Sequence, residues 1–231
     1  MYNIAIDGPA GAGKSTIARQ IAKRKGYIYV DTGAMYRAMA LFLLENHIAP
    51  DDTERISQKS QEADISIIYE NGEQVVLLNG RNVNGLIRTE EVSNMSSASS
   101  VNGDVRKKLV ELQQKLAKEA DVVMDGRDIG TCVLPHADLK IYLTASSEVR
   151  AKRRYDEMKA RGDVCDIGVI KKDIEERDYR DMHRDISPLK QAEDAVLVDS
   201  SDMTIGEVID KIMGMCGWAG GRKMLRESDF G

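Results

Sequence analysis

Eight residues near the start of the chain, Gly8 to Ser15, have the types and spacing of a loop that binds phosphate. Two glycines bracket four free positions, and Lys14 and Ser15 follow the second glycine. Glycines let the backbone curl with several N–H groups pointing inward at an anion, where side chains would obstruct it. The Lys14 ammonium suits the β- and γ-phosphates of a nucleotide, and the Ser15 hydroxyl can bind Mg²⁺. The candidate nucleotide-binding residues are Gly8, Pro9, Ala10, Gly11, Ala12, Gly13, Lys14, Ser15 and Thr16.

The surroundings of this loop favour a nucleotide site over a glycine-rich turn that binds nothing. A short apolar run, residues 2–6, comes before the loop and has the character of a buried strand. Ile17 and Ile21 follow at helical spacing, so the helix would begin where the loop ends. A helix begun there turns the positive end of its dipole toward the same anion.

The rest of the chain alternates between apolar strands and amphipathic helices. This alternation is typical of a parallel sheet with helices on its faces. The expected further strands are residues 27–30, 121–125, 139–143 and 195–198, and the expected later helices include 146–160, 167–184 and 205–213.

One stretch, residues 65–83, departs from this alternation. Asn71-Gly72 and Asn79-Gly80 separate three runs rich in β-forming residues. Asn-Gly between such runs is a strong signal for a tight hairpin turn, so we expect a small antiparallel meander inserted into the α/β fold. The insert could serve the active site or be decoration without a catalytic part.

Asp125 lies where the strand beside the phosphate loop should end. A carboxylate there can hold Mg²⁺ directly or through a water, although an aspartate at a strand end can also cap a turn. With Ser15, it is our candidate metal ligand.

Arginines from distant segments form the second constellation. Arg177, Asp181 and Arg184 share one helix face, because they are spaced by four and then three residues. Arginine grips phosphate with two hydrogen bonds and keeps its charge when desolvated. The alternative is a set of solvated helix faces, but several of these arginines follow strand ends or border glycine turns. The full set is Arg37, Arg127, Arg150, Arg153, Arg154, Arg161, Arg177 and Arg184.

Composition narrows the remaining possibilities. The 231 residues carry a net charge of −5, which argues against a nucleic-acid binder that works through a basic field. The three cysteines and three histidines are scattered and match no metal or redox spacing. No apolar run approaches a membrane span and no leader precedes the first strand. We expect a cytoplasmic monomer that binds small molecules and neither nucleic acid nor a membrane.

Four motifs together resemble the bacterial cytidylate kinase family. They are DGPAGAGKST at 7–16, DTGAMYR at 31–37, DGRDIGT at 125–131 and ERDYRDMHR at 176–184, and the resemblance covers residues 2–213. It implies transfer of phosphate from ATP, with Mg²⁺, to CMP or dCMP in pyrimidine metabolism. It also implies the P-loop kinase fold, an α/β fold with a five-stranded parallel sheet flanked by helices, a small antiparallel β insert and a helical lid.

The same resemblance assigns roles to individual residues. Catalysis would rest on Lys14, Arg127, Arg184 and Arg154, and Arg153 and Arg154 in the lid would contact ATP. The acceptor would be held by Thr32, Tyr36, Arg37, Ser99, Arg106, Arg127, Asp128, Arg177, Asp181 and Arg184. Thr32 stands where many relatives have serine. The serine-rich segment leaves Ser97 or Ser100 possible in place of Ser99.

The expected segments follow from these assignments. They are 1–62 for the core with the phosphate loop and the start of the monophosphate-binding region, 63–88 for the insert, 89–145 for monophosphate-binding helices and core, 146–166 for the lid, 167–216 for core and 217–231 for a flexible tail. Two other functions stay open, a kinase for UMP or AMP and a P-loop switch that hydrolyses nucleotide. The chain has no Asn-Lys-x-Asp motif, with which such switches read guanine.

Overall fold

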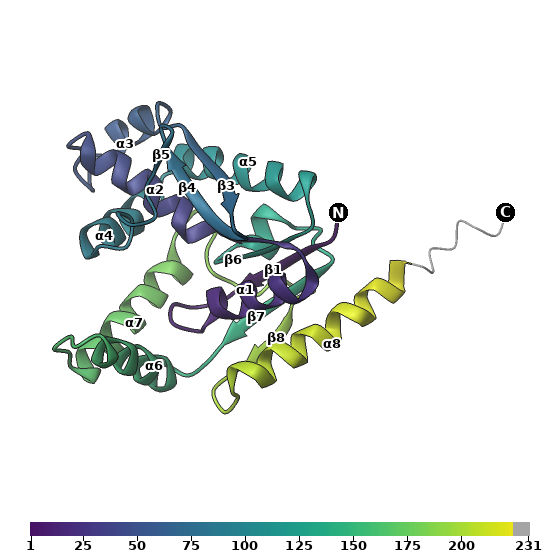
Figure 1. The fold of residues 1–231 in the computed structure, drawn as a ribbon. Helices are drawn as coiled ribbons and strands as arrows, with labels where there is room; N and C mark the ends of the chain where they lie inside the picture. The colour runs from purple at the N-terminus through teal and green to yellow at the C-terminus, as the bar shows by residue number, and fades with distance from the viewer. Residues whose placement is uncertain (224–231) are drawn as a thin grey trace. The chain divides into compact units, whose positions relative to one another are not determined.

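The computed structural model describes the backbone of residues 1–223 and the side chains of residues 1–216. The chain divides into two compact units. The first unit contains residues 28–122 with Met1, and the second contains residues 2–27 and the described chain from Val123 onward. Figure 1 shows the course of the chain through both.

A five-stranded sheet with strand order β2-β6-β1-β7-β8 forms the centre of the fold. Its middle strands are buried along most of their length, which explains their near-continuous apolar sequences. β7 runs parallel to both of its neighbours, β1 and β8. The predicted five-stranded parallel sheet flanked by helices is confirmed. The strands are β1 (Asn3–Asp7), β2 (Ile28–Asp31), β6 (Val122–Gly126), β7 (Leu139–Thr144) and β8 (Val196–Asp199).

Four α-helices belong to the described part of the second unit. α1 ends at a left-handed Gly26, while the side chains of Ser146 and Asp166 cap the N-termini of α6 and α7. α6 and α7 lie side by side and share a small apolar cluster of Ala151, Ile170 and Ile174 (Figure 1). The helices are α1 (Lys14–Lys25), α6 (Ser147–Ala160), α7 (Ile167–His183) and α8 (Ile205–Lys223).

The first unit contains the expected antiparallel insert. Asn71, Gly72, Asn79 and Gly80 all have positive φ, the backbone conformation that a two-residue hairpin turn with two left-handed residues requires. The sheet order is β3-β4-β5, which confirms the predicted meander. The strands of the meander are β3 (Ile65–Glu70), β4 (Glu73–Leu78) and β5 (Arg81–Asn82). The helices of the first unit are α2 (Thr32–Glu45), α3 (Thr53–Ser60), α4 (Glu90–Ser99) and α5 (Gly103–Glu119).

The insert is hydrogen-bonded to the segment that begins α2. The Gln74 side chain accepts from the Asp31 N–H over 2.8 Å and donates to the Asp31 carbonyl oxygen over 3.3 Å. The Tyr69 hydroxyl donates to the carbonyl oxygen of Tyr29. Asp31 in turn caps α2 by accepting from Ala34 N–H. The insert therefore supports the helix start that carries Tyr36 and Arg37.

Two elements differ from those expected from the sequence. A π-helical turn, Ile129–Val133, follows β6 where no element was expected. α8 continues to Lys223, ten residues past the Met213 at which we expected it to end. Of the expected tail, residues 224–231 lie outside the described residues. No helix in the described part of the chain is long and apolar enough to cross a membrane.

Candidate active site

The phosphate loop connects β1 to α1, as its sequence predicts. A Cβ at Gly8 would lie 1.9 Å from the carbonyl oxygen of Leu143 in β7, so only glycine fits there. Gly13 faces open space, but its φ of +84° is in the left-handed region. The two glycines thus shape the loop for different reasons, and α1 begins at Lys14 directly after them.

The Lys14 side chain is buried and turned toward its own loop. Its Nζ donates a hydrogen bond to the carbonyl oxygen of Pro9 over 2.7 Å. Burial, and then the like charge of Arg127, lower the pKa of the Lys14 ammonium to about 7. A bound polyphosphate would favour the charged ammonium, because an opposite charge nearby raises the pKa of a lysine.

Ser15 and Asp125 lie together beside the loop. The Ser15 hydroxyl donates to Asp125 Oδ2 over 2.9 Å, which joins the first turn of α1 to the end of β6. A hydroxyl and a carboxylate are oxygen ligands of the kind that Mg²⁺ takes alongside the oxygens of a nucleotide. No cluster of three His, Cys, Asp or Glu side chains occurs among residues 1–216 that could hold a metal by protein ligands alone. The pair therefore fits an Mg²⁺ ion that comes with its nucleotide.

Asp7, at the end of β1, anchors the segment after β6. Its two carboxylate oxygens accept from the N–H groups of Ile129 and Gly130 over 2.8 and 2.7 Å. A Cβ at Gly130 would approach Asp7 Oδ2 at 3.3 Å, so the glycine permits this close contact. Burial raises the pKa of the Asp7 carboxyl to about 6, although the two N–H groups oppose the rise. Asp7 thereby fixes the turn that carries Arg127 and Asp128.

The expected acceptor residues of the second unit meet in acid–base pairs. Arg127 Nε donates to Asp181 Oδ2 over 2.8 Å. Arg184 Nη2 lies 3.5 Å from Asp128 Oδ1, and both side chains are less than a tenth exposed. Arg177 lies exposed on α7. Two arginines suited to an anion are thus held in place by carboxylates.

The arginines of α6 differ from one another in their surroundings. Arg153 donates to the hydroxyl and the carbonyl oxygen of Ser200, beyond β8, and Arg154 is exposed beside Glu157. Arg150 is buried and forms an ion pair with Asp178 of α7. The sequence analysis placed Arg150 in the lid, and this assignment did not predict that its side chain is buried.

Four of the expected acceptor residues lie on α2 and α5 of the first unit. Tyr36 and Arg37 lie on α2 one turn from the buried Thr32. The Arg106 guanidinium lies over the Tyr36 ring, 5.8 Å from its centroid, in a cation–π contact. Arg37 Nη2 lies 3.5 Å from Asp31 Oδ2.

Ser99 has an unsatisfied hydroxyl. The residue is fully buried, and its Oγ has no hydrogen-bond partner within the described residues. A buried polar atom without a protein partner is satisfied by an ordered water or by a ligand. Ser100, one of the alternatives, instead donates to the carbonyl oxygen of Ser97. Ser99 therefore has a hydroxyl available for a ligand and stays the predicted substrate contact.

Two residues of this region, Asp7 and Asp178, were given no role from the sequence. Asp178 did carry a signal, because it continues the spacing of Ile170 and Ile174 along α7. A carboxylate in line with a buried apolar stripe predicts a buried partner. Asp7 had no comparable signal, since its partners lie 122 and 123 residues away.

Comparison with known proteins identifies relatives along nearly the whole chain. The cytidylate kinase family model matches residues 4–217. Proteins named cytidylate kinase from Caldicellulosiruptor bescii and Caldicellulosiruptor saccharolyticus are 50% and 51% identical over 211 residues, which is 91% of this chain and 93% of each relative. Among solved structures, an uncharacterized protein from Eubacterium ventriosum has a TM-score of 0.53 at 11% identity, with coverage of 93% of this chain and 98% of that one, a likeness of fold alone.

Proposed function

The chain belongs to the cytidylate kinase family, and on this premise we propose that it transfers the γ-phosphoryl group of ATP to CMP or dCMP. The products are ADP and CDP or dCDP. Identity of about half over nine tenths of the chain is the observation that carries this proposal. The phosphate loop and the paired arginines support it, because a kinase must hold a donor and an acceptor phosphate.

The donor site is assigned to the phosphate loop and α6. The loop N–H groups and Lys14 hold the ATP phosphates, while Arg153 and Arg154 contact ATP from α6. Ser15 and Asp125 would hold Mg²⁺, which would neutralise the charge that develops on the phosphates during transfer. The donor residues are Gly8, Pro9, Ala10, Gly11, Ala12, Gly13, Lys14, Ser15, Thr16, Arg153 and Arg154.

The acceptor residues are assigned from the family resemblance. Tyr36, Arg37, Arg127 and Arg184 hold the CMP phosphate. Arg177 and Asp181 hold the ribose, and Ser99, Arg106 and Asp128 read the cytosine. Thr32 is a further residue of the acceptor site. Arginine donors suit N3 and O2 of cytosine, and the Asp128 carboxylate suits its amino group.

The transfer needs no general base. The second pKa of the acceptor phosphate is near 6, so its oxygens are largely ionised at pH 7. One of them attacks the γ-phosphorus, the bond to the β–γ bridging oxygen breaks, and ADP leaves with that electron pair. Lys14, Arg127, Arg184 and Arg154 stabilise the charge that builds up on the transferring group. Arg127 and Arg184 begin this step already oriented by Asp181 and Asp128.

One assay separates this function from its competitors. ADP production from ATP is measured with CMP, dCMP, UMP and AMP in turn and without any acceptor. Turnover that depends on CMP or dCMP supports the proposal. Preference for UMP or AMP would reassign the substrate, and hydrolysis without an acceptor would indicate a nucleotide switch.

We also propose that the enzyme works as a cytoplasmic monomer in pyrimidine nucleotide metabolism. Its substrates are small molecules, and its net charge of −5 does not favour nucleic acid as a partner. Sedimentation equilibrium of the purified chain tests the oligomeric state.

A further inference from the structure

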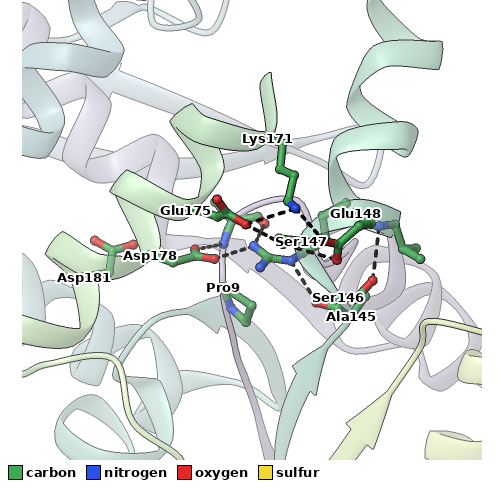
Figure 2. A network of polar contacts seen from close by, with 12 residues as sticks. Pro9, Ala145, Ser146, Ser147, Glu148, Lys171, Glu175, Asp178 and Asp181 are labelled. Carbon is green, nitrogen blue, oxygen red and sulfur yellow. Dashed lines mark hydrogen bonds and ion pairs between the residues drawn. The ribbon is translucent and has the colours of Figure 1, made fainter. Parts of the chain in front are cut away.

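Both backbone polar groups of Ala10, in the phosphate loop, are held by one buried ion pair. The Ala10 N–H donates to Asp178 Oδ1 over 3.1 Å, and Arg150 Nη1 donates to the Ala10 carbonyl oxygen over 2.8 Å. The same Arg150 nitrogen donates to Asp178 Oδ2 over 2.5 Å. The three residues close a hydrogen-bonded ring, and Figure 2 shows Asp178 pointing from α7 toward the loop beside Pro9.

The ring is fixed from its far side as well. Arg150 Nε donates to the carbonyl oxygen of Ala145 over 2.9 Å, which ties the guanidinium to the end of β7. Both charged side chains are about nine-tenths buried or more, so water competes little for their hydrogen bonds. A Cβ at Gly11 would lie 3.4 Å from Arg150 Cβ, so the loop rests directly on the stem of this arginine.

This arrangement controls which loop groups can face a phosphate. The Ala10 N–H is taken up by Asp178, so the anion must be bound by the N–H groups that follow it. Their direction depends on how the chain leaves Ala10, because a few degrees of rotation there would misplace the rest of the loop. Positioning of phosphate-binding groups is the main source of catalysis in phosphoryl transfer.

The ring also joins the loop to two helices. Arg150 belongs to the first turn of α6, and Asp178 belongs to α7. These helices are linked a second time on their surface, where Lys171 contacts Glu148 and Glu175 (Figure 2). The surface link bridges the same helices through side chains other than those that bond Ala10, so it provides a matched control.

We propose that Arg150 and Asp178 are positioning residues that set the phosphate loop in its ATP-binding shape and couple it to the packing of α6 and α7. Neither residue is assigned a contact with a substrate. The inference rests on the proposed ATP-dependent function. The competing account is that the pair only stabilises the fold.

A double variant separates positioning from stability. Arg150→Met or Asp178→Leu alone leaves one buried charge without its partner and should lower the melting temperature. Arg150→Met with Asp178→Leu removes both charges, and replacing a whole buried ion pair by apolar side chains is often neutral for stability. We expect the double variant to regain most of the lost melting temperature. Its KM for ATP should nevertheless remain at least about tenfold above wild type, with the KM for CMP within about twofold.

Two further variants complete the test. Lys171→Gln removes the surface ion pairs with Glu148 and Glu175, and it should leave both KM values unchanged. Arg150→Lys keeps both charges but has no counterpart of the Nε–H that anchors Arg150 to Ala145, so its KM for ATP should rise at least about threefold. The Arg150→Lys variant keeps the proposal testable if the double variant does not fold. A folded double variant or Arg150→Lys variant with the wild-type KM for ATP would overturn the proposal, as would an equal rise in Lys171→Gln.

Direct binding keeps this inference separate from the proposed function. ADP is titrated calorimetrically into the wild type and the same variants, because its phosphates need only the loop and no acceptor. If the wild type phosphorylates no nucleoside monophosphate, the proposed function fails. Weakened ADP binding in the double variant would still support the positioning pair, and unchanged ADP binding would contradict it.

Discussion

Lys14 Nζ lies 2.7 Å from the carbonyl oxygen of Pro9, five residues earlier in the same loop. The hydrogen bond thus holds the Lys14 amino group inside the loop. Its hydrogen bond to Pro9 also keeps it at the site where donor phosphates are expected.

Lys14→Ala should lower kcat by at least about a hundredfold, because Lys14 stabilises charge mainly in the transition state. CMP binding should stay largely intact, since Lys14 belongs to the donor loop. Steady-state kinetics and calorimetric CMP titration measure the two effects. Lys23→Ala, an exposed lysine on the same helix, is the control. A Lys14→Ala enzyme within about threefold of wild-type turnover would show that the loop assignment is wrong.

The second prediction concerns the Asp128 carboxylate and the selectivity for CMP over UMP. Asp128 lies beside Arg184, so its carboxylate could either read cytosine or merely orient this arginine. With UMP bound, the carboxylate would face a carbonyl oxygen in place of an amino group. The mismatch should cost about 1–3 kcal/mol, or roughly ten- to a hundredfold in kcat/KM.

Asp128→Ala distinguishes these roles through the ratio of kcat/KM for CMP to that for UMP. Base reading predicts that the ratio collapses, because CMP loses a partner while UMP loses a repulsion. A residue that only orients Arg184 would weaken both substrates alike. An unchanged ratio therefore rules out base reading by Asp128.

The raised pKa of Asp7 predicts a pH dependence of stability. In the folded protein this pKa is about 6, against 3.8 for an ordinary aspartate. The folded state therefore holds the proton more tightly, and the free energy of unfolding should fall as pH rises from about 4 to 6. The loss should reach about 3 kcal/mol at most. Urea denaturation of wild type and Asp7→Asn across this window measures it.

The Asp7 effect is the difference between the two proteins, since other groups titrate in both. The free energy of wild type minus that of Asp7→Asn should decrease between pH 4 and 6 and stay level above pH 7. A constant difference throughout would mean that the Asp7 pKa is not raised by burial.

The exposed half of α6 should respond to ligands. Beyond Arg150 and Ala151, the rest of α6 and the turn after it, as far as Gly162, present mostly exposed polar side chains. Such a segment should open easily in the free protein. Hydrogen exchange in residues 152–162 should slow when ADP and CMP are both bound, and exchange in β7 should change little. Equal exchange with and without ligands would exclude a lid role for α6.

Most of the fold could be predicted from local patterns in the sequence. The strands are apolar because they are buried, and the Asn-Gly turns need left-handed backbone that these residues tolerate. The phosphate loop could be predicted for a similar reason, since its glycines, lysine and serine have fixed spacing along the chain. Each of these features depends on neighbours in sequence.

The remaining features depend on partners distant in sequence. Arg150 and Arg154 look alike in a helical sequence, yet one is buried against Asp178 and the other is exposed. The π-helical turn after β6 depends on Asp7, whose carboxylate binds two of its N–H groups. No periodicity along the chain encodes such a contact.

Gly8 and Gly13 also predict how this enzyme can vary in evolution. A side chain at position 8 would strike the Leu143 backbone inside β7, so no substitution there is compatible with an intact sheet. At position 13 a side chain would have space, so a substitution costs only the free energy of the left-handed backbone. Among residues other than glycine, asparagine adopts this conformation at the lowest cost. In a saturation library selected for folded protein, position 8 should therefore stay glycine, whereas asparagine should persist at position 13.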